Sequence, residues 1–384
     1  MRAVVTGMIA TFPIGGVAWD YGQYALALER LGFEVFYLED AGWLMYDTHA
    51  REYVEYSAQA IAFLERTLRE LSPSLADRWH LRTPGGRCLG LERDAIGELV
   101  ADADLLLNVS GSCLLRDEYR ACSRKVLIDT DPGLNHFVNY PRQDADPPLD
   151  GVASFRAHDH FFTYAERLGR HDCALPALGI DWLPTRPPVV LDRWQPEPPG
   201  TTWTTVMSWN NWKPFADVTM SYGSKEMEFP HVEGLPSRTD APLEIAVGGS
   251  DAPRKRWTAA GWSVLDSHAI SATADAYQSY VQRSRGELSV AKNSYVATRS
   301  GWFSCRSACY LAAGRPVVLQ DTGFSEVMPT GEGLLAFSGA DEAAAAIAAA
   351  EADYAHHARA ARELARSELD SDLVVGSLLA RVGL

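Results

Sequence analysis

The 384-residue sequence has few of the features that mark disulfide-rich, zinc-binding or membrane-spanning proteins. Its six cysteines form no C-x-x-C pair and have no histidine at zinc-finger spacing, so we predict reduced thiols and no zinc finger. No apolar run approaches the roughly eighteen residues of a membrane span, since the longest, at 343–350, is a short alanine-rich segment. Only 35 basic residues oppose 50 acidic ones, and a net charge of -15 argues against a nucleic-acid partner.

Length and composition are those of an ordinary folded protein with two domains. The sequence is 47% hydrophobic and 22% charged, and a chain of this length typically divides into units of roughly 100–200 residues. Residues 1–10 are apolar, but no small-residue cleavage site follows them, so we predict a first strand and not a signal peptide. A cytoplasmic protein is expected, and the sequence does not indicate an oligomeric state.

Apolar runs alternate with amphipathic segments in the first half of the chain. A strand at 4–9, a loop with Gly15 and Gly16, a helix at 21–31 and a strand at 33–38 predict buried parallel strands. Further elements are expected at the following positions: strands at 105–109, 126–128 and 161–164, and helices at 53–71 and 95–101.

Six prolines between 184 and 200 predict a linker, and the same alternation resumes after it. The expected strands there lie at 204–209, 243–247, 263–265, 287–290 and 316–319, and the expected helices at 254–260, 272–283, 304–313 and 340–384. We therefore predict an α/β fold of two Rossmann-like, doubly wound domains facing a cleft. The predicted boundaries are 1–183 and 201–365 for the domains, 184–200 for the linker, and 366–384 for a C-terminal helix that packs back on the first domain.

Residues 297–326 form the most informative stretch, with a predicted loop, helix, strand and loop in turn. Gly301 and Ser304 precede the helix, whose first N–H groups should be unpaired and face the cleft, where they favour an anion such as a diphosphate. Arg299 and Arg306 would add positive charge at the same end. The alternative is ordinary capping by Ser304 beside two solvated arginines.

This stretch resembles the donor-binding region of the group-1-like, GT-B fold nucleotide-sugar glycosyltransferases. Gly314-Arg315-Pro316 enters a strand, and the Gly-x-x-Glu loop that follows is Gly323 to Glu326. The Gly-Gly loop at 12–17 also resembles the opening loop of that family. Two glutamates found eight residues apart in some members would fall at Gly301 and Cys309, so this chain lacks that pair.

The resemblance implies transfer of a sugar from a nucleotide-diphosphate sugar to a hydroxyl of a small-molecule or glycan acceptor. We expect this transfer to need no metal and no cofactor besides the donor. The first domain is then the acceptor side and the second the donor side. A nucleotide-sugar epimerase or hydrolase of the same fold, and a non-catalytic sugar-nucleotide-binding protein, are the alternatives.

The candidate binding residues follow from these patterns. Gly301, Ser304, Arg299 and Arg306 are expected to hold the diphosphate, and the glycine pair to let the backbone approach a ligand closely. Asn210 and Lys292 follow predicted strands, where they would contact the donor, although core packing or solvation are alternatives. The expected contacts to ribose or sugar hydroxyls are Asp321, Thr322, Gly323 and Glu326.

Three residues of the first domain are candidates for the base that deprotonates the acceptor: Asp20, Asp131 and His136. Asp20 lies one turn into the first helix, where an acid also complements the helix dipole. Asp131 follows Asp129 at a strand end, and such a D-x-D pair holds a metal in the other glycosyltransferase fold. The same spacing recurs elsewhere in this chain, so we predict no metal site.

Overall fold

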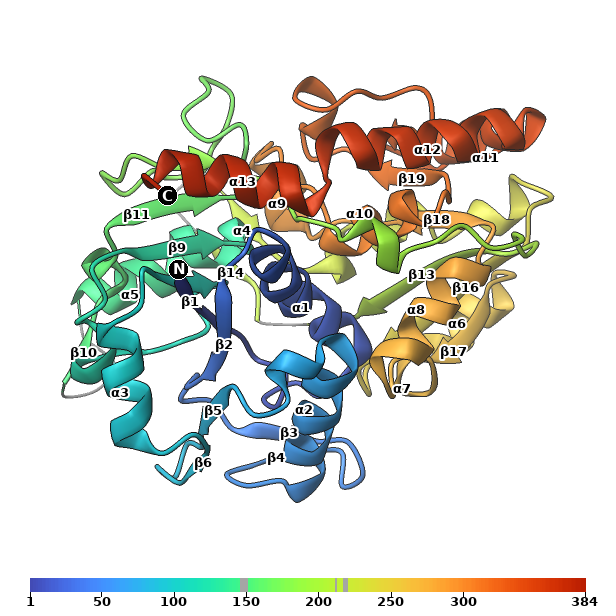
Figure 1. Ribbon diagram of the computed structural model, residues 1–384. Helices are drawn as coiled ribbons and strands as arrows, with labels where there is room; N and C mark the ends of the chain where they lie inside the picture. The colour runs from blue at the N-terminus through green and yellow to red at the C-terminus, as the bar shows by residue number, and fades with distance from the viewer. Residues whose placement is uncertain (146–150, 211–212, 217–219) are drawn as a thin grey trace.

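The computed structural model describes residues 1–145, 151–210, 213–216 and 220–384. Within these residues the chain forms two α/β domains, each built on a twisted sheet (Figure 1). The first sheet has the strand order β12-β11-β9-β7-β1-β2-β5-β6, and the second has the order β17-β16-β13-β18-β19-β20. Neighbouring strands run parallel except β5 and β6.

The strands of the first sheet are β1 (Arg2–Thr6), β2 (Glu34–Glu39), β5 (Trp79–Arg82), β6 (Cys88–Gly90), β7 (Leu105–Val109), β9 (Lys125–Asp129), β11 (His160–Thr163) and β12 (Leu183–Pro184). The α-helices of this domain are α1 (Gly15–Arg30), α2 (Ala58–Leu71), α3 (Arg93–Ala101), α4 (Pro132–Leu134) and α5 (Tyr140–Ala145). Two small antiparallel pairs accompany them: β3 (Met45–Asp47) with β4 (Glu52–Val54), and β8 (Leu115–Arg116) with β10 (Val152–Ala153).

The strands of the second sheet are β13 (Trp203–Ser208), β16 (Leu243–Gly248), β17 (Ser263–Asp266), β18 (Gly286–Ser289), β19 (Val317–Gln320) and β20 (Leu334–Phe337). The helices are α6 (Arg254–Ala259), α7 (Ser267–Ile270), α8 (Ala274–Arg283), α9 (Asn293–Ala297), α10 (Cys305–Ala312), α11 (Ala340–Ala352), α12 (Tyr354–Glu368) and α13 (Ser371–Arg381). A short antiparallel pair, β14 (Phe215–Ala216) and β15 (Ser221–Tyr222), lies between β13 and β16 in the sequence.

Successive residues of the central strands face opposite cores, as a doubly wound sheet requires. In β1, Val5 joins the core that contains α1 and α2, whereas Val4 joins the core of α3. In β19, Val317 faces α10 and α12, and Val318 faces α6 and α11. The predicted architecture of layered α/β domains is therefore confirmed.

Most expected elements lie within two residues of the observed ones, but the helix expected at 53–71 begins too early. Residues 52–54 form β4, and α2 begins only after Ser57, whose hydroxyl accepts a hydrogen bond from the Ala60 N–H at 3.2 Å. The helical tail is also interrupted, because Asp353 and Asp370 cap new helices. Helix α13 packs on α1 of the first domain, where Asp372 pairs with Arg30 at 2.9 Å (Figure 1).

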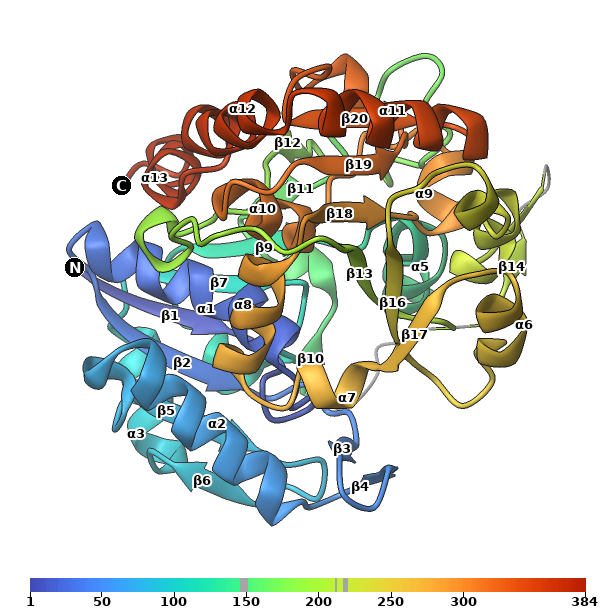
Figure 2. The ribbon, with the colours of Figure 1, turned by 90° about the vertical axis from the view of Figure 1, so that its right-hand side faces the viewer.

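One apolar cluster runs through both domains. It includes α1 of the first domain and α8 and α10 of the second, which lie side by side in Figure 2. Trp194, in the proline-rich segment, is fully buried between Trp19 of α1, at a ring separation of 5.0 Å, and Tyr277 of α8, at 6.5 Å. In the described part of the chain, no helix is both long and apolar enough to cross a membrane.

We expect Trp194→Ala to lower the free energy of unfolding by about 3–5 kcal/mol, because it empties a buried site between the domains. The indole N–H of Trp194 has no hydrogen-bond partner among the described residues, so Trp194→Phe should cost much less. Urea denaturation of the two variants measures the difference. Equal losses for both substitutions would show that the indole nitrogen, and not the ring volume, stabilises this contact.

Candidate active site

The carboxyl ends of the two sheets face one another, so the loops that follow the strands of one domain contact those of the other. The Gly15 N–H donates to the Ser271 carbonyl oxygen at 2.7 Å. Farther along, the Trp302 indole N–H donates to the Thr130 carbonyl oxygen at 2.9 Å. Open α/β sheets bind their ligands at this edge, so these interdomain loops define the candidate site.

A buried carboxylate holds the loop between β1 and α1. Glu39, the last residue of β2, accepts hydrogen bonds from the backbone N–H groups of Ala10 at 2.9 Å and Thr11 at 2.6 Å. Burial raises the pKa of Glu39, and these hydrogen bonds oppose that rise. The anchored loop fixes where Gly15 and Gly16 enter α1.

The two glycines lie against the second domain. A Cβ atom on Gly15 would come within 2.3 Å of the Thr273 carbonyl oxygen, and one on Gly16 within 3.3 Å of the Tyr277 ring. The sequence predicts that the missing side chains of the two glycines leave room for a ligand. In this arrangement that room is filled by the start of α8.

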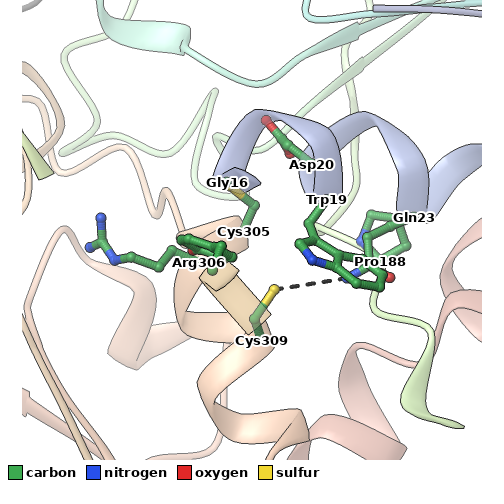
Figure 3. A pocket seen from close by; sticks show the side chains of 9 residues that line it. Gly16, Trp19, Asp20, Gln23, Pro188, Cys305, Arg306 and Cys309 are labelled. Atoms are coloured by element: carbon green, nitrogen blue, oxygen red, sulfur yellow. Dashed lines mark hydrogen bonds between the residues drawn. The ribbon is translucent and has the colours of Figure 1, made fainter. Parts of the chain in front are cut away.

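Asp20 and the start of α10 line a small cavity between the domains (Figure 3). Its volume is about 10 Å³, which is room for about one water molecule. The lining residues come from α1, the proline-rich segment, α8 and α10: Gly16, Trp19, Asp20, Gln23, Pro188, Tyr277, Cys305, Arg306 and Cys309. A diphosphate therefore fits at this point only after the domains move apart.

Asp20 is the one of the three predicted bases that lines this cavity. Burial raises the pKa of Asp20 to about 6, while a hydrogen bond with the Cys305 thiol opposes the rise. A carboxyl group with a pKa near neutrality in an interdomain cavity is typical of a catalytic acid or base.

Helix α10 begins directly after Ser304, as the sequence predicts. Among the described residues, the N–H groups of Cys305, Arg306 and Ser307 have no hydrogen-bond partner. The Ser307 hydroxyl is also buried without a partner there, and the Ser304 side chain does not cap the helix. A helix start with unpaired N–H groups attracts an anion.

Two predicted parts of this anion site have other partners. The Gly301 N–H donates to the Thr322 carbonyl oxygen at 2.8 Å. Arg306 reaches β18, where its Nε donates to Glu287 and its Nη2 to the Ser289 hydroxyl, both at 2.5 Å. The prediction that Arg306 holds a diphosphate directly is therefore wrong for this arrangement, because its guanidinium is committed to a buried ion pair.

His136 is also unsuited to the predicted role of base. It is fully buried, its Nδ1 lies 2.7 Å from the Pro176 carbonyl oxygen, and its Nε2 lies 3.0 Å from the Asp129 carboxylate. The Thr163 hydroxyl donates to the same carboxylate at 3.0 Å. Since both ring nitrogens have protein partners, His136 connects Asp129 at the end of β9 with the Pro176 carbonyl group. Neither nitrogen is left to contact a substrate.

Asp131 ties the two domains together. Its carboxylate accepts a hydrogen bond from the Tyr295 hydroxyl at 2.5 Å and pairs with Lys292. The predicted site residues Asp131 and Lys292 thus meet, although they lie in different domains. Because both carboxylate oxygens have partners from the second domain, Asp131 acts here as an interdomain contact and not as a base.

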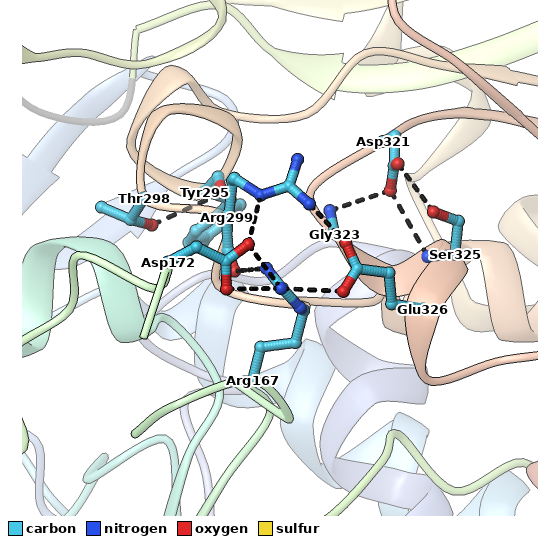
Figure 4. A network of polar contacts seen from close by, with 9 residues as sticks. All are labelled: Arg167, Asp172, Tyr295, Thr298, Arg299, Asp321, Gly323, Ser325 and Glu326. Atoms are coloured by element: carbon cyan, nitrogen blue, oxygen red, sulfur yellow. Dashed lines mark hydrogen bonds and ion pairs between the residues drawn. The ribbon is translucent and has the colours of Figure 1, made fainter. Parts of the chain in front are cut away.

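A second interdomain network includes Arg299 and Glu326 (Figure 4). Arg167, from the first domain, donates to Asp172 at 2.7 Å and to Glu326 at 2.8 Å. Arg299 pairs with the same two carboxylates. Hydrogen bonds from the two arginines lower the pKa of Asp172 to about 2. These contacts hold the loop after β19 against the first domain.

Asp321 shapes that loop. Its carboxylate accepts from the Gly323 N–H at 2.8 Å and from the Ser325 hydroxyl at 2.7 Å, while the Thr322 hydroxyl donates to a backbone carbonyl at 2.6 Å. Gly323 has a φ of +89°, and a Cβ atom there would lie 2.9 Å from the Arg167 side chain. Only glycine fits both the backbone angle and the close contact.

Asn210 lies apart from these residues. Its amide donates to Asp251 at 2.5 Å on an exposed part of the surface. The preceding Trp209 packs in the core, with its ring 4.9 Å from that of Trp257. Residues 211–212, which belong to the same predicted cluster, lie outside the described residues.

Sequence reasoning missed Lys225, a buried amine that interacts electrostatically with Cys305 and Arg306 at the start of α10. Its Nζ donates to the Val290 carbonyl oxygen at 2.8 Å. Burial lowers the pKa of Lys225 well below its ordinary value, and repulsion by Arg306 and Lys292 lowers it further. The Ser224 hydroxyl beside it is buried without a partner among the described residues. An anion bound here would raise the pKa of the amine and favour its charged form.

A compositional signal for Lys225 was present. The chain has only five lysines among its 35 basic residues, and lysine and arginine are not interchangeable at sites that bind phosphate. Gly223 and Ser224 precede Lys225, and small residues beside a lysine are common in loops that bind phosphate.

The sequence matches no model of a known protein family, and it matches no curated protein. Solved structures, however, match the whole chain. AviGT4, a glycosyltransferase involved in avilamycin A biosynthesis, has a TM-score of 0.55 at 12% identity, covering 100% of this chain and 97% of that one. HepE of Anabaena, in complex with UDP and glucose, has a TM-score of 0.58 at 10% identity, covering 100% of both chains.

The chain has the GT-B fold. A glycosyltransferase from Rickettsia africae supports the same conclusion, with a TM-score of 0.53 at 10% identity over 99% of this chain and 97% of that one. In this chain the start of α10 lines the cavity between the two domains. In the described part of the chain, no three His, Cys, Asp or Glu side chains converge as a set of metal ligands.

Arg306→Ala tests the corrected role of Arg306. It leaves the fully buried Glu287 without its cationic partner, and breaking such a pair costs about 3–5 kcal/mol. Adding Glu287→Gln should recover part of that loss, because the uncompensated charge disappears. Denaturant unfolding of the single and double variants measures this, and an Arg306→Ala protein as stable as the wild type would contradict the assignment.

Proposed function

We propose that the protein is a glycosyltransferase that moves a sugar from a nucleoside-diphosphate sugar to a hydroxyl group of a small-molecule or glycan acceptor. The observation that carries the proposal is the start of α10 at the interdomain cleft of a GT-B fold, where three N–H groups have no partner among the described residues. Solved structures of similar fold support it, since HepE has been described with UDP-glucose bound.

In this proposal the diphosphate binds at the N–H groups of Cys305, Arg306 and Ser307. Charge on the leaving diphosphate develops as the glycosidic bond breaks, and fixed N–H donors stabilise it without reorganising. Lys225 supplies the compensating cation. Its amine is already desolvated, so it loses little further hydration when the phosphate arrives.

The donor enters when the domains separate, because the closed cavity has a volume of only about 10 Å³. Separation breaks the contacts of Arg167 and Asp172, from the first domain, with Glu326 and Arg299. We propose that the loop from Asp321 to Glu326 then contacts the ribose or sugar hydroxyls. Closure afterwards excludes water from the reacting carbon.

We propose that the transfer uses no metal ion. The D-x-D carboxylates that would hold one have other partners in this fold. Asp129 accepts hydrogen bonds from Asn135, at 2.7 Å, and from other side chains around it, and Asp131 is bound by Tyr295 and Lys292.

Lys225→Met tests the donor site, with the exposed Lys255→Met on α6 as the matched control. Loss of a charge-assisted hydrogen bond should weaken UDP binding by about 1.5–3 kcal/mol, which is roughly tenfold or more. The control should bind as the wild type does. Calorimetry with UDP measures both, in buffer with EDTA, and unchanged affinity in Lys225→Met would remove this residue from the site.

Turnover of UDP-glucose by the wild type distinguishes the functions that share this fold. Transfer to an added hydroxyl compound supports the proposal. Free glucose, an epimerised donor, or tight binding of UDP without turnover would instead indicate a hydrolase, an epimerase or a binding protein.

We propose that Asp20 is the base that deprotonates the acceptor hydroxyl, and Asp20→Asn tests this role. Because the pKa of Asp20 is about 6, kcat/KM of the wild type should fall as the pH drops below about 6 and the carboxylate takes up a proton. The variant should lose about 100-fold or more in kcat. If Asp20 serves only as a negative charge beside α10, the variant will keep its kcat and bind UDP more tightly.

Stability gives an independent check on the same variant. The pKa of Asp20 rises from 3.8 to about 6 on folding, so the folded protein binds the proton more tightly and the wild type loses stability as the pH rises between these values. At pH 7.5 Asp20→Asn should therefore unfold at the same or a higher denaturant concentration than the wild type. A lower midpoint would show that the carboxylate stabilises the fold.

A further inference from the structure

A second and larger cavity lies between α2 of the first domain and residues 268–272 of the second. Its volume is about 310 Å³, which falls in the range of small-molecule sites. Figure 2 shows α2 and α7 facing each other at this place. The residues that line it come from both domains: Pro13, Ile14, Thr48, His49, Gln59, Ala62, Phe63, Arg66, His268, Ser271 and Ala272.

The charged and titratable side chains that line this cavity are an arginine and two histidines. Arg66, His49 and His268 line it, and no carboxylate of the described residues does, although acids outnumber bases in the chain by 50 to 35. Among the described residues Arg66 has no ion-pair or hydrogen-bond partner; its guanidinium lies 5.7 Å from the centre of the Phe63 ring. A guanidinium held over an aromatic ring, without a carboxylate, is suited to an anion from solution.

The rest of the lining combines apolar side chains, among them Pro13, Ile14, Ala62 and the Phe63 ring, with the polar Thr48, Gln59 and Ser271. An exposed aromatic cluster adjoins the cavity on the β3–β4 hairpin, where the Tyr46 ring stacks on His268 at 5.8 Å and lies 5.2 Å from the Tyr53 ring. Trp43 and Tyr53, both more than half exposed, extend this cluster into solvent. Aromatic rings gathered beside a cationic cavity favour a ligand that has a ring of its own.

The cavity is separate from the candidate active site. The hydrogen bond from the Gly15 N–H to the Ser271 carbonyl oxygen, together with the close contact of Gly15 with Thr273, lies between the two. Ile14 lines the larger cavity, whereas Gly16, two residues later, lines the cavity of Asp20.

We propose that the larger cavity is a second ligand site, which binds a small aromatic carboxylate or phosphate. The anionic group pairs with Arg66, and the aromatic ring lies against the apolar wall of Ile14 and Phe63. Such a ligand contacts both domains at once, so its binding favours their closed arrangement. This site does not depend on the glycosyltransferase activity proposed above.

The test compares two aromatic anions, 4-hydroxybenzoate and 4-hydroxyphenyl phosphate, with the neutral 4-hydroxybenzamide by calorimetry or ligand-observed NMR. The proposal predicts that at least one anion binds the wild type and that the amide binds at least tenfold more weakly. Arg66→Ala should raise the Kd of that anion about tenfold. Arg69→Ala, an equal change of charge at an exposed position on the same helix outside the cavity, should leave it unchanged.

Lys225→Met separates this site from the donor site. The variant should bind the aromatic anion as the wild type does, and Arg66→Ala should bind UDP as the wild type does. Equal binding of anion and amide, no effect of Arg66→Ala, or loss of anion binding in Lys225→Met would each overturn the proposal. Failure of UDP to bind would count against the glycosyltransferase function alone.

An activity assay with a sugar donor and the anion that binds shows whether the cavity is an acceptor site or a regulatory site. Glycosylation of its phenolic hydroxyl, seen as an added hexose mass, identifies the cavity as an acceptor site. A changed rate of donor turnover without such a product identifies it as a site for a regulatory ligand.

Discussion

The start of a helix leaves N–H groups that its own backbone cannot satisfy, and burying them without a partner is costly. In this protein such groups lie at Cys305, Arg306 and Ser307, where α10 meets the first domain. Asp20 and a cavity of about 10 Å³ lie opposite them. The other features of the cleft, from the buried Lys225 to the interdomain ion pairs, gain a common explanation if an anion satisfies these groups when the domains open.

Ion pairs between the domains hold the closed arrangement, and binding of the donor must replace them with contacts to the donor. Arg167 and Asp131 of the first domain pair with Glu326 and Lys292 of the second, and the glycine pair of α1 lies against α8. Ion pairs that are partly exposed contribute little net stability, so they can break at small cost when a charged donor replaces one partner. An apolar cluster that includes Trp194 also joins the two domains.

The fold could be predicted because its signals are local. Buried parallel strands are short apolar runs, and the glycine-proline step after α10 marks where a helix ends and a strand begins. Elements with weaker local signals, such as β20 and the small β3–β4 pair, were missed. Their strand geometry comes from pairing with neighbours that a single sequence does not reveal.

The site was only partly predictable, because its chemistry depends on partners distant in the sequence. Ser304 and α10 lie where the local pattern placed them, yet nothing near Arg306 reveals that Glu287 of a neighbouring strand occupies its guanidinium. His136 was misjudged for the same reason, since Asp129 and the Pro176 carbonyl occupy its ring. Lys225 was missed because its altered pKa comes from burial, which the sequence does not reveal.

A crystal structure with UDP bound tests the central claim most directly. We expect diphosphate oxygens within hydrogen-bond distance of the N–H groups of residues 305–307 and of Lys225, with the domains farther apart than in this structure. A diphosphate bound elsewhere would contradict the claim.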